Sequence, residues 1–172
     1  MNKKCIYYVE GDCEEQFIKS MKLDPAKLLP GKVKIYNIIQ NEIPKSQLLT
    51  ISPGTIVTLV FDTDKPITHH LKKNIDQLKR HCQSVKIICL AQVLNFEDEL
   101  VRATDVKKIQ ELTKSKSVSE FKSDFCRMKE KECRSMLVRH KIDLDKMWVE
   151  DVGDAFGFLR NQISNRKLII KG

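Results

Sequence analysis

The sequence predicts an α/β fold, in which a mostly parallel central sheet of about four strands is flanked by helices and followed by a helical C-terminal extension. Short apolar runs alternate with amphipathic segments over the first two thirds of the chain, as in parallel sheets covered by helices. The last third instead carries apolar residues at helical spacing. The expected division is an α/β domain over residues 1–105 and a helical extension over residues 106–172 that packs on it.

The first two expected elements are a strand at Cys5–Val9 and a helix that begins at about Asp12. The strand is a short run of apolar and aromatic residues that stops at the charged Glu10. Asp12 is a residue type that caps helices, and Gly11 lets the backbone turn into the helix. The buried stripe of this helix is expected to consist of Phe17, Ile18 and Met21.

The next strands are expected at Val33–Ile39, where apolar and polar residues alternate, and at Thr55–Phe61. A short helix at Pro44–Leu49 separates them. The run at Thr55–Phe61 is apolar at nearly every position, which is typical of a central strand covered on both faces. It leads directly into Asp62-Thr63-Asp64.

A helix from beyond Pro66 to about Cys82 and a fourth strand at Val85–Leu90 complete the predicted α/β domain. The stretch Lys107–Lys116 is the expected linker. After it, Ser117-Val118-Ser119-Glu120 has the form of a capping box at the start of a helix. The last helix is expected to begin within residues 153–159, and Trp148 is expected to be a core or subunit-contact anchor.

Composition excludes several classes of protein. The 172 residues include 41% hydrophobic and 31% charged residues, a balance that favours a folded chain over a disordered one. No window approaches 18 uninterrupted apolar residues, so we expect a cytoplasmic protein with no membrane partner. Six cysteines without a tight framework are expected to be reduced thiols. The 31 Lys and Arg against 23 Asp and Glu give a net charge of +8, which favours a polyanionic partner such as DNA or RNA.

Acidic residues follow two of the predicted strands. Glu10-Gly11-Asp12-Cys13-Glu14-Glu15 comes after the first strand, and Asp62-Thr63-Asp64 comes after the third. Open α/β sheets bind ligands at the carboxyl ends of their strands. Carboxylate oxygens in such a crevice suit Mg²⁺ or Mn²⁺, so Glu10, Glu14, Asp62 and Asp64 are candidate metal ligands.

A second interpretation assigns some of these acids to helix capping. Asp12 would be an N-cap with Glu15 as its capping-box partner, and Asp64 would cap the helix after Pro66. Capping does not explain Glu10 and Asp62, which directly follow two apolar strands. A charge at such a position is costly unless it is exposed in a crevice or bound to a partner.

The order of the motifs Val9-Glu10-Gly11 and Phe61-Asp62-Thr63-Asp64, each after a strand of one sheet, resembles the TOPRIM domain of topoisomerases, primases and OLD-family nucleases. The pattern at Val9 to Glu15 is most similar to the OLD and RloB-like branch, which is associated with bacterial phage defence. The resemblance covers residues 4 to 100 and implies a Rossmann-like parallel sheet with a metal-dependent phosphoryl-transfer site.

The resemblance also implies roles for individual residues. Glu10 matches the motif glutamate, a metal ligand or general acid/base, and Glu14 matches the second acid of the nuclease branch. Asp62 and Asp64 match the aspartate pair that holds Mg²⁺. Asn95-Phe96-Glu97 is similar, with altered spacing, to a segment of RloB-like proteins, which makes Glu97 a further candidate ligand.

The function expected from these observations is a metal-dependent nuclease with Glu10, Asp62 and Asp64 as catalytic residues and Lys65 as a phosphate-binding residue. Two alternatives remain: a non-catalytic basic module that binds nucleic acid or an ATPase partner, and another Mg²⁺-dependent phosphoryl-transfer enzyme. Adjacent His69 and His70 are expected to point to different faces of their helix, so no shared ligand role is assigned to them.

Overall fold

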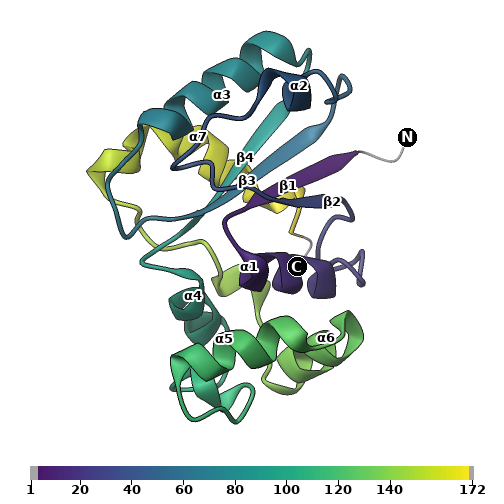
Figure 1. The fold of residues 1–172 in the computed structure, drawn as a ribbon, viewed down its shortest axis with the longest axis vertical. Coiled ribbons are helices and arrows are strands. Elements are labelled where there is room, and N and C mark those ends of the chain that lie inside the picture. The colour runs from purple at the N-terminus through teal and green to yellow at the C-terminus, as the bar shows by residue number, and fades with distance from the viewer. Residues whose placement is uncertain (1–3, 171–172) are drawn as a thin grey trace.

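The computed structural model describes residues 4–170 and confirms the α/β fold. Four parallel strands form one sheet in the order β2-β1-β3-β4, with helices on both of its faces (Figure 1). The strands are β1 (Cys5–Val9), β2 (Lys32–Ile35), β3 (Ile56–Asp62) and β4 (Lys86–Gln92). The predicted strands are therefore confirmed in number and direction, with small differences in their ends.

The second strand is shorter than the sequence predicts, and the side chain of Asn37 explains why. Its Oδ1 accepts hydrogen bonds from the backbone N–H groups of Ile39 and Gln40, at 3.1 and 2.9 Å. This local turn competes with strand pairing and bends the chain away from the sheet. Strand β2 consequently ends at Ile35.

The helices divide between the two faces of the sheet (Figure 1). One face carries α2 (Lys45–Leu48), α3 (His69–His81) and α7 (Arg160–Ser164). The other carries α1 (Asp12–Met21), α4 (Phe96–Ala103), α5 (Val118–Arg127) and α6 (Glu130–Arg139). Short 3₁₀ segments lie at Ile109–Glu111, Leu144–Lys146, Asp154–Leu159 and Asn165–Leu168. The covering helices explain why β3 is buried at six of its seven positions.

Two hydrophobic clusters fill the space between the sheet and its helices. The cluster on the α1 face joins Tyr7 and Val60 of the sheet to Phe125 and Leu137 of α5 and α6, so the helices after residue 105 share a core with β1. The cluster on the α3 face includes Phe156, whose ring stacks on that of Phe61 with centroids 5.9 Å apart.

Trp148 is confirmed as a core residue. It is 2% exposed, and its ring meets Phe17 of α1 edge-on at 6.1 Å between centroids.

The segment Lys107–Lys116, the predicted linker, is not an exposed linker. It contains a 3₁₀ segment, and the side chains of Ile109 and Leu112 are buried in the cluster on the α1 face.

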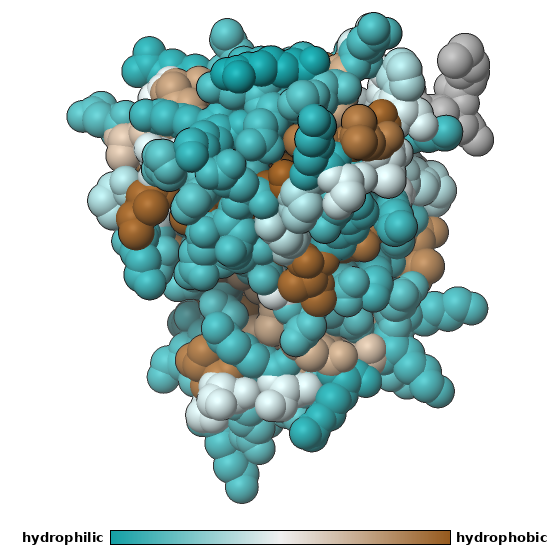
Figure 2. All heavy atoms as spheres, turned by 45° about the horizontal axis from the view of Figure 1, so that its top comes forward, coloured by the Kyte–Doolittle hydropathy of each residue, from teal (hydrophilic) through white to brown (hydrophobic). Residues whose placement is uncertain are grey.

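The surface carries no extended apolar patch on the face drawn in Figure 2, where apolar side chains are scattered among hydrophilic ones. None of the helices between residues 4 and 170 combines the length and the apolar character needed to cross a membrane.

Gly31 lies where β2 begins beside β1, and it leaves no room for a side chain. A Cβ atom at this position would lie 2.6 Å from the backbone oxygen of Cys5. We expect Gly31→Ala to lower the free energy of unfolding by about 1–3 kcal/mol, because the two strands would have to separate. Urea unfolding followed by circular dichroism measures the change.

Gly157→Ala is the matched control. A Cβ atom there meets no heavy atom within 4 Å among the described residues. Its effect should stay within about 0.5 kcal/mol. Equal stability of the two variants would contradict the close approach of β1 and β2.

Candidate acidic metal site

The pairing of β1 with β3 brings the two acidic motifs to one edge of the sheet. The strands are parallel and in register from Cys5 opposite Ile56 to Tyr8 opposite Leu59. Glu10 directly follows β1, and Asp62 is the last residue of β3. Both carboxyl groups therefore lie at the carboxyl ends of neighbouring strands, as the sequence predicts.

Four of the five candidate metal ligands line one open pocket of about 490 Å³. Glu10 and Asp62 come from the strand ends, Glu14 from the first turn of α1, and Glu97 from the first turn of α4. The side chain of Asn95 caps α4 by accepting a hydrogen bond from the backbone N–H of Asp98 at 3.0 Å. This cap fixes the start of the helix that carries Glu97.

The capping interpretation of Asp12 is wrong. Helix α1 begins at Asp12 itself, its N-cap is Gly11, and no side chain makes a capping hydrogen bond there. Gly11 is extended, with φ of −149°, a conformation open to any residue. Glu15 instead pairs with Lys19 at 2.8 Å, whereas Glu14 is only 7% exposed at the pocket.

Asp64 and Lys65 are exposed in the loop after β3 and do not line the pocket. Asp64 is not a helix cap either, since α3 begins at His69 with Thr68 before it. Both residues nevertheless act on the pocket electrostatically. The negative charge of Asp64 raises the pKa of Glu10, and the positive charge of Lys65 lowers the pKa of Glu10.

The pKa values of the pocket carboxyl groups are raised. Burial raises the pKa of Asp62 to about 8, with further contributions from the charges of Glu10, Glu14, Asp64 and Glu97. Burial, followed by the charge of Glu14, raises the pKa of Glu10 to about 7. The pKa of Glu14 is raised mainly by burial as well. Repulsion among several partly buried acids is the situation that a bound cation relieves.

One buried oxygen of Asp62 is unsatisfied. Its Oδ1 atom makes no hydrogen bond to any described residue, although it is shielded from solvent. Buried polar atoms are nearly always paired, so such an atom beside other carboxylates suits a role as a cation ligand. Carboxylate oxygens alone are the donor set that Mg²⁺ and Mn²⁺ prefer, so the pocket residues suit these ions in donor type. Among the described residues, no three of these carboxylates bring ligand atoms within 4.8 Å of one another, so an ion would have to draw them closer together.

The pocket also contains residues that the sequence interpretation missed. Asn37 donates from Nδ2 to Glu10 Oε2 at 3.5 Å, and the Nζ of Lys122 lies 3.1 Å from Glu97 Oε1. The sulfur atoms of Cys13 and Cys126 lie 3.3 Å apart in the pocket wall. Asn37 follows the observed second strand but falls inside the strand that the sequence predicts at Val33–Ile39, so its place at the pocket was hidden. Lys122 and Cys126 come from α5, and nothing in their local sequence indicates this location.

All six cysteines are free thiols, as the sequence predicts.

No protein-family model matches the chain, and comparisons with curated proteins and with solved structures find no significant match. The functional assignment therefore depends on the residues and geometry of the acidic pocket.

The raised pKa values predict how the stability of the metal-free protein depends on pH. The folded protein holds protons on Glu10 and Asp62 that the unfolded chain releases above about pH 4. Their contribution to stability is therefore full below about pH 4 and is lost as the pH rises through about 7 to 8. We expect a loss of roughly 1–3 kcal/mol, reduced by solvent screening, in urea unfolding with EDTA.

Asp62→Asn should remove much of this pH dependence and stabilise the metal-free protein at pH 8. Asp76→Asn, an exposed aspartate of α3, is the control and should leave the dependence unchanged. A wild-type stability that is flat between pH 5 and pH 8 would be inconsistent with carboxyl crowding in the pocket.

Proposed function

We propose that this protein is a Mg²⁺- or Mn²⁺-dependent nuclease of TOPRIM type that hydrolyses phosphodiester bonds in nucleic acid. The observation that carries the proposal is the convergence of Glu10, Glu14, Asp62 and Glu97 on one pocket, with a buried Asp62 oxygen that lacks a partner among the described residues. This arrangement favours the metal-site interpretation of the acids over the capping interpretation.

The proposed ligands are the four carboxylates that line the pocket: Glu10, Glu14, Asp62 and Glu97. Asp64 lies outside the pocket and acts on it through its charge. A bound divalent ion would supply a polarised phosphate and a water of lowered pKa. Glu10 directly follows β1 at the pocket and is the proposed metal ligand or general acid/base. Asp62 is the other proposed catalytic residue, because it ends β3 and lines the pocket. The sequence-based catalytic role of Asp64 is not carried over, since Asp64 lies outside the pocket.

The proposed substrate follows from charge. The chain has a net charge of +8, and Lys122 lies at the pocket while Lys65 lies in the loop after β3. We propose that these ammonium groups bind phosphates of the nucleic-acid backbone near the acidic site. The resemblance to the OLD and RloB-like branch supports a role in phage defence, with an ATPase as a candidate partner.

Removal of one pocket carboxylate tests the assignment. We expect Glu10→Gln and Asp62→Asn each to lower Mn²⁺-dependent cleavage of DNA or RNA by about 100-fold or more, because each loses a charge that holds the ion against the substrate. Cleavage is measured on labelled single-stranded and duplex substrates of both kinds.

Glu15→Gln is the control, since Glu15 lies beside Glu14 in the first turn of α1 but pairs with Lys19 and does not line the pocket. It should retain cleavage. A non-catalytic module would instead bind nucleic acid without Mn²⁺-dependent cleavage, and its Mn²⁺ affinity would not respond to Asp62→Asn.

Lys65 is predicted to contribute to substrate binding rather than to chemistry. We expect Lys65→Ala to raise KM for nucleic acid several-fold at unchanged kcat, and to reduce the slope of log affinity against log salt by about 1. Initial rates over a salt series measure both quantities. Lys19→Ala is the control, and a loss of kcat in Lys65→Ala would refute the phosphate-binding role.

A further inference from the structure

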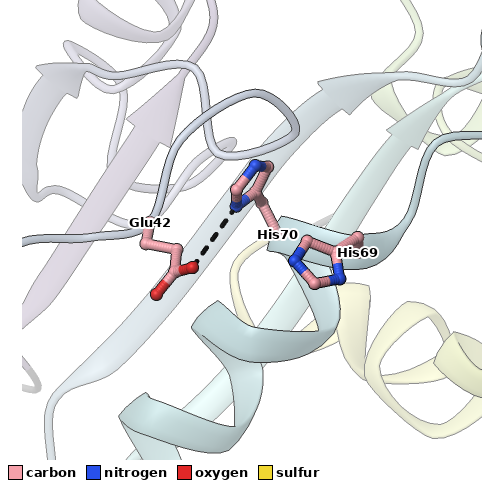
Figure 3. A group of neighbouring side chains, drawn as sticks. All are labelled: Glu42, His69 and His70. Atoms are coloured by element: carbon pink, nitrogen blue, oxygen red, sulfur yellow. Dashed lines mark ion pairs between the residues drawn. The ribbon is translucent and has the colours of Figure 1, made fainter.

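A second group of metal-ligating side chains lies outside the acidic pocket, at the start of α3. Glu42, in the loop between β2 and α2, faces His69 and His70 of the first turn of α3 (Figure 3). One ligand atom from each of the three residues lies within 4.8 Å of the other two. None of the three lines the acidic pocket.

The two histidine rings lie together, contrary to the expectation that adjacent residues would separate them. Their centroids are 4.9 Å apart, with an angle of 73° between the ring planes. Helical side chains lean toward the preceding turn, and at the first turn of a helix no such turn crowds them. Both rings can therefore turn toward Glu42 (Figure 3).

The loop that carries Glu42 is fixed against α3 by a buried asparagine. Asn74 donates from Nδ2 to the backbone oxygens of Ile38 and Asn41, each at 2.9 Å, and accepts from the backbone N–H of Ile43 at 2.7 Å. The hydroxyl group of Tyr36 also donates to the backbone oxygen of Glu42 at 2.6 Å. These bonds hold Glu42 opposite the histidines before any ligand binds.

The donor set differs in kind from that of the acidic pocket. Nδ1 of His70 is shielded from solvent, lies 3.6 Å from Glu42 Oε1 and makes no hydrogen bond within the described part of the chain. Two imidazoles and one carboxylate suit Zn²⁺ and related transition metals, which bind three protein ligands and leave one position open. Magnesium prefers oxygen ligands alone.

A lysine pairs with the same Glu42 oxygen that faces His70. The Nζ of Lys73 lies 2.8 Å from Glu42 Oε1, and Gln77 donates to Oε2 at 3.2 Å. The hydrogen bond from Lys73 keeps the pKa of Glu42 below its ordinary value. The Lys73 side chain is 50% exposed, so its ammonium group can move into water.

We propose that Glu42, His69 and His70 form a binding site for Zn²⁺ or a similar divalent transition metal, which displaces the ammonium group of Lys73. The site is separate from the acidic pocket and does not depend on nuclease activity.

Zinc titration of the full chain tests the proposal. All measurements use the double variant Glu10→Gln/Asp62→Asn, in which ion binding in the acidic pocket is weakened. Isothermal titration calorimetry measures the affinity of the metal-stripped protein for Zn²⁺. Loss of a residue that hydrogen-bonds a metal ligand already lowers metal affinity about 10–100-fold. Loss of a ligand itself should therefore weaken Zn²⁺ binding by at least about tenfold in each of three variants: Glu42→Gln, His69→Ala and His70→Ala. His81→Ala, at the other end of α3, should have no effect.

Lys73→Ala separates a metal site from a plain ion pair. We expect it to tighten Zn²⁺ binding several-fold, because the competing cation is gone, whereas Lys79→Ala on the same helix should not. Unchanged affinity in Lys73→Ala, or in the three ligand variants, would overturn the proposal. The Co²⁺ complex of the protein should show no thiolate charge-transfer absorption, because no cysteine belongs to the proposed site. If the complex does absorb in this way, and the double variant Cys13→Ser/Cys126→Ser loses the absorption, the metal binds at the cysteines and the proposal is overturned.

Discussion

The parallel pairing of β1 with β3 is the constraint on which the candidate site depends. Neighbouring parallel strands end at the same edge of a sheet, so an acid placed after each strand must share that edge with the other. Glu10 and Asp62 are placed in this way. The first turns of α1 and α4 then add Glu14 and Glu97 to the same pocket. The mutual repulsion of these groups contributes to the raised pKa values of Glu10 and Asp62.

A buried glutamate nearby shows what a purely structural carboxylate looks like in this protein. Glu99 is fully buried, and its oxygens accept hydrogen bonds from the backbone of Val93 and Trp148 and from the side chain of Arg102, at 2.7 to 3.0 Å. It ties the end of β4 to the segment before the last helices. Asp62 has no comparable set of donors among the described residues, and its Oδ1 is unpaired. The fold therefore satisfies one buried acid internally and leaves the other available to an external cation.

The helices after residue 105 contribute to the site as well as to the core. Gln16 of α1 donates to the backbone oxygen of Met128 at 2.7 Å, which joins α1 to the end of α5. The rings of Phe17 and Phe125 each pack edge to face on that of Phe96, which lines the pocket. This packing carries Lys122 and Cys126 to the pocket wall, beside Glu97 and Cys13. The pocket is thus bordered by both halves of the chain, and the positive charge of Lys122 offsets part of its negative charge.

The sequence by itself determined the strands, their parallel arrangement and the acids at the ends of β1 and β3, because hydrophobic periodicity and motif order are local properties of the chain. It misplaced the end of β2, where two hydrogen bonds to Asn37 form a local turn, and the cap of α1, which is Gly11 rather than Asp12. It also misplaced the start of α3, which begins at His69 after Thr68. Only the tertiary structure decided which acids meet, that Lys122 reaches the pocket, and that Glu42 faces His69 and His70. Those contacts join residues far apart in the chain, and packing between elements sets them rather than local sequence.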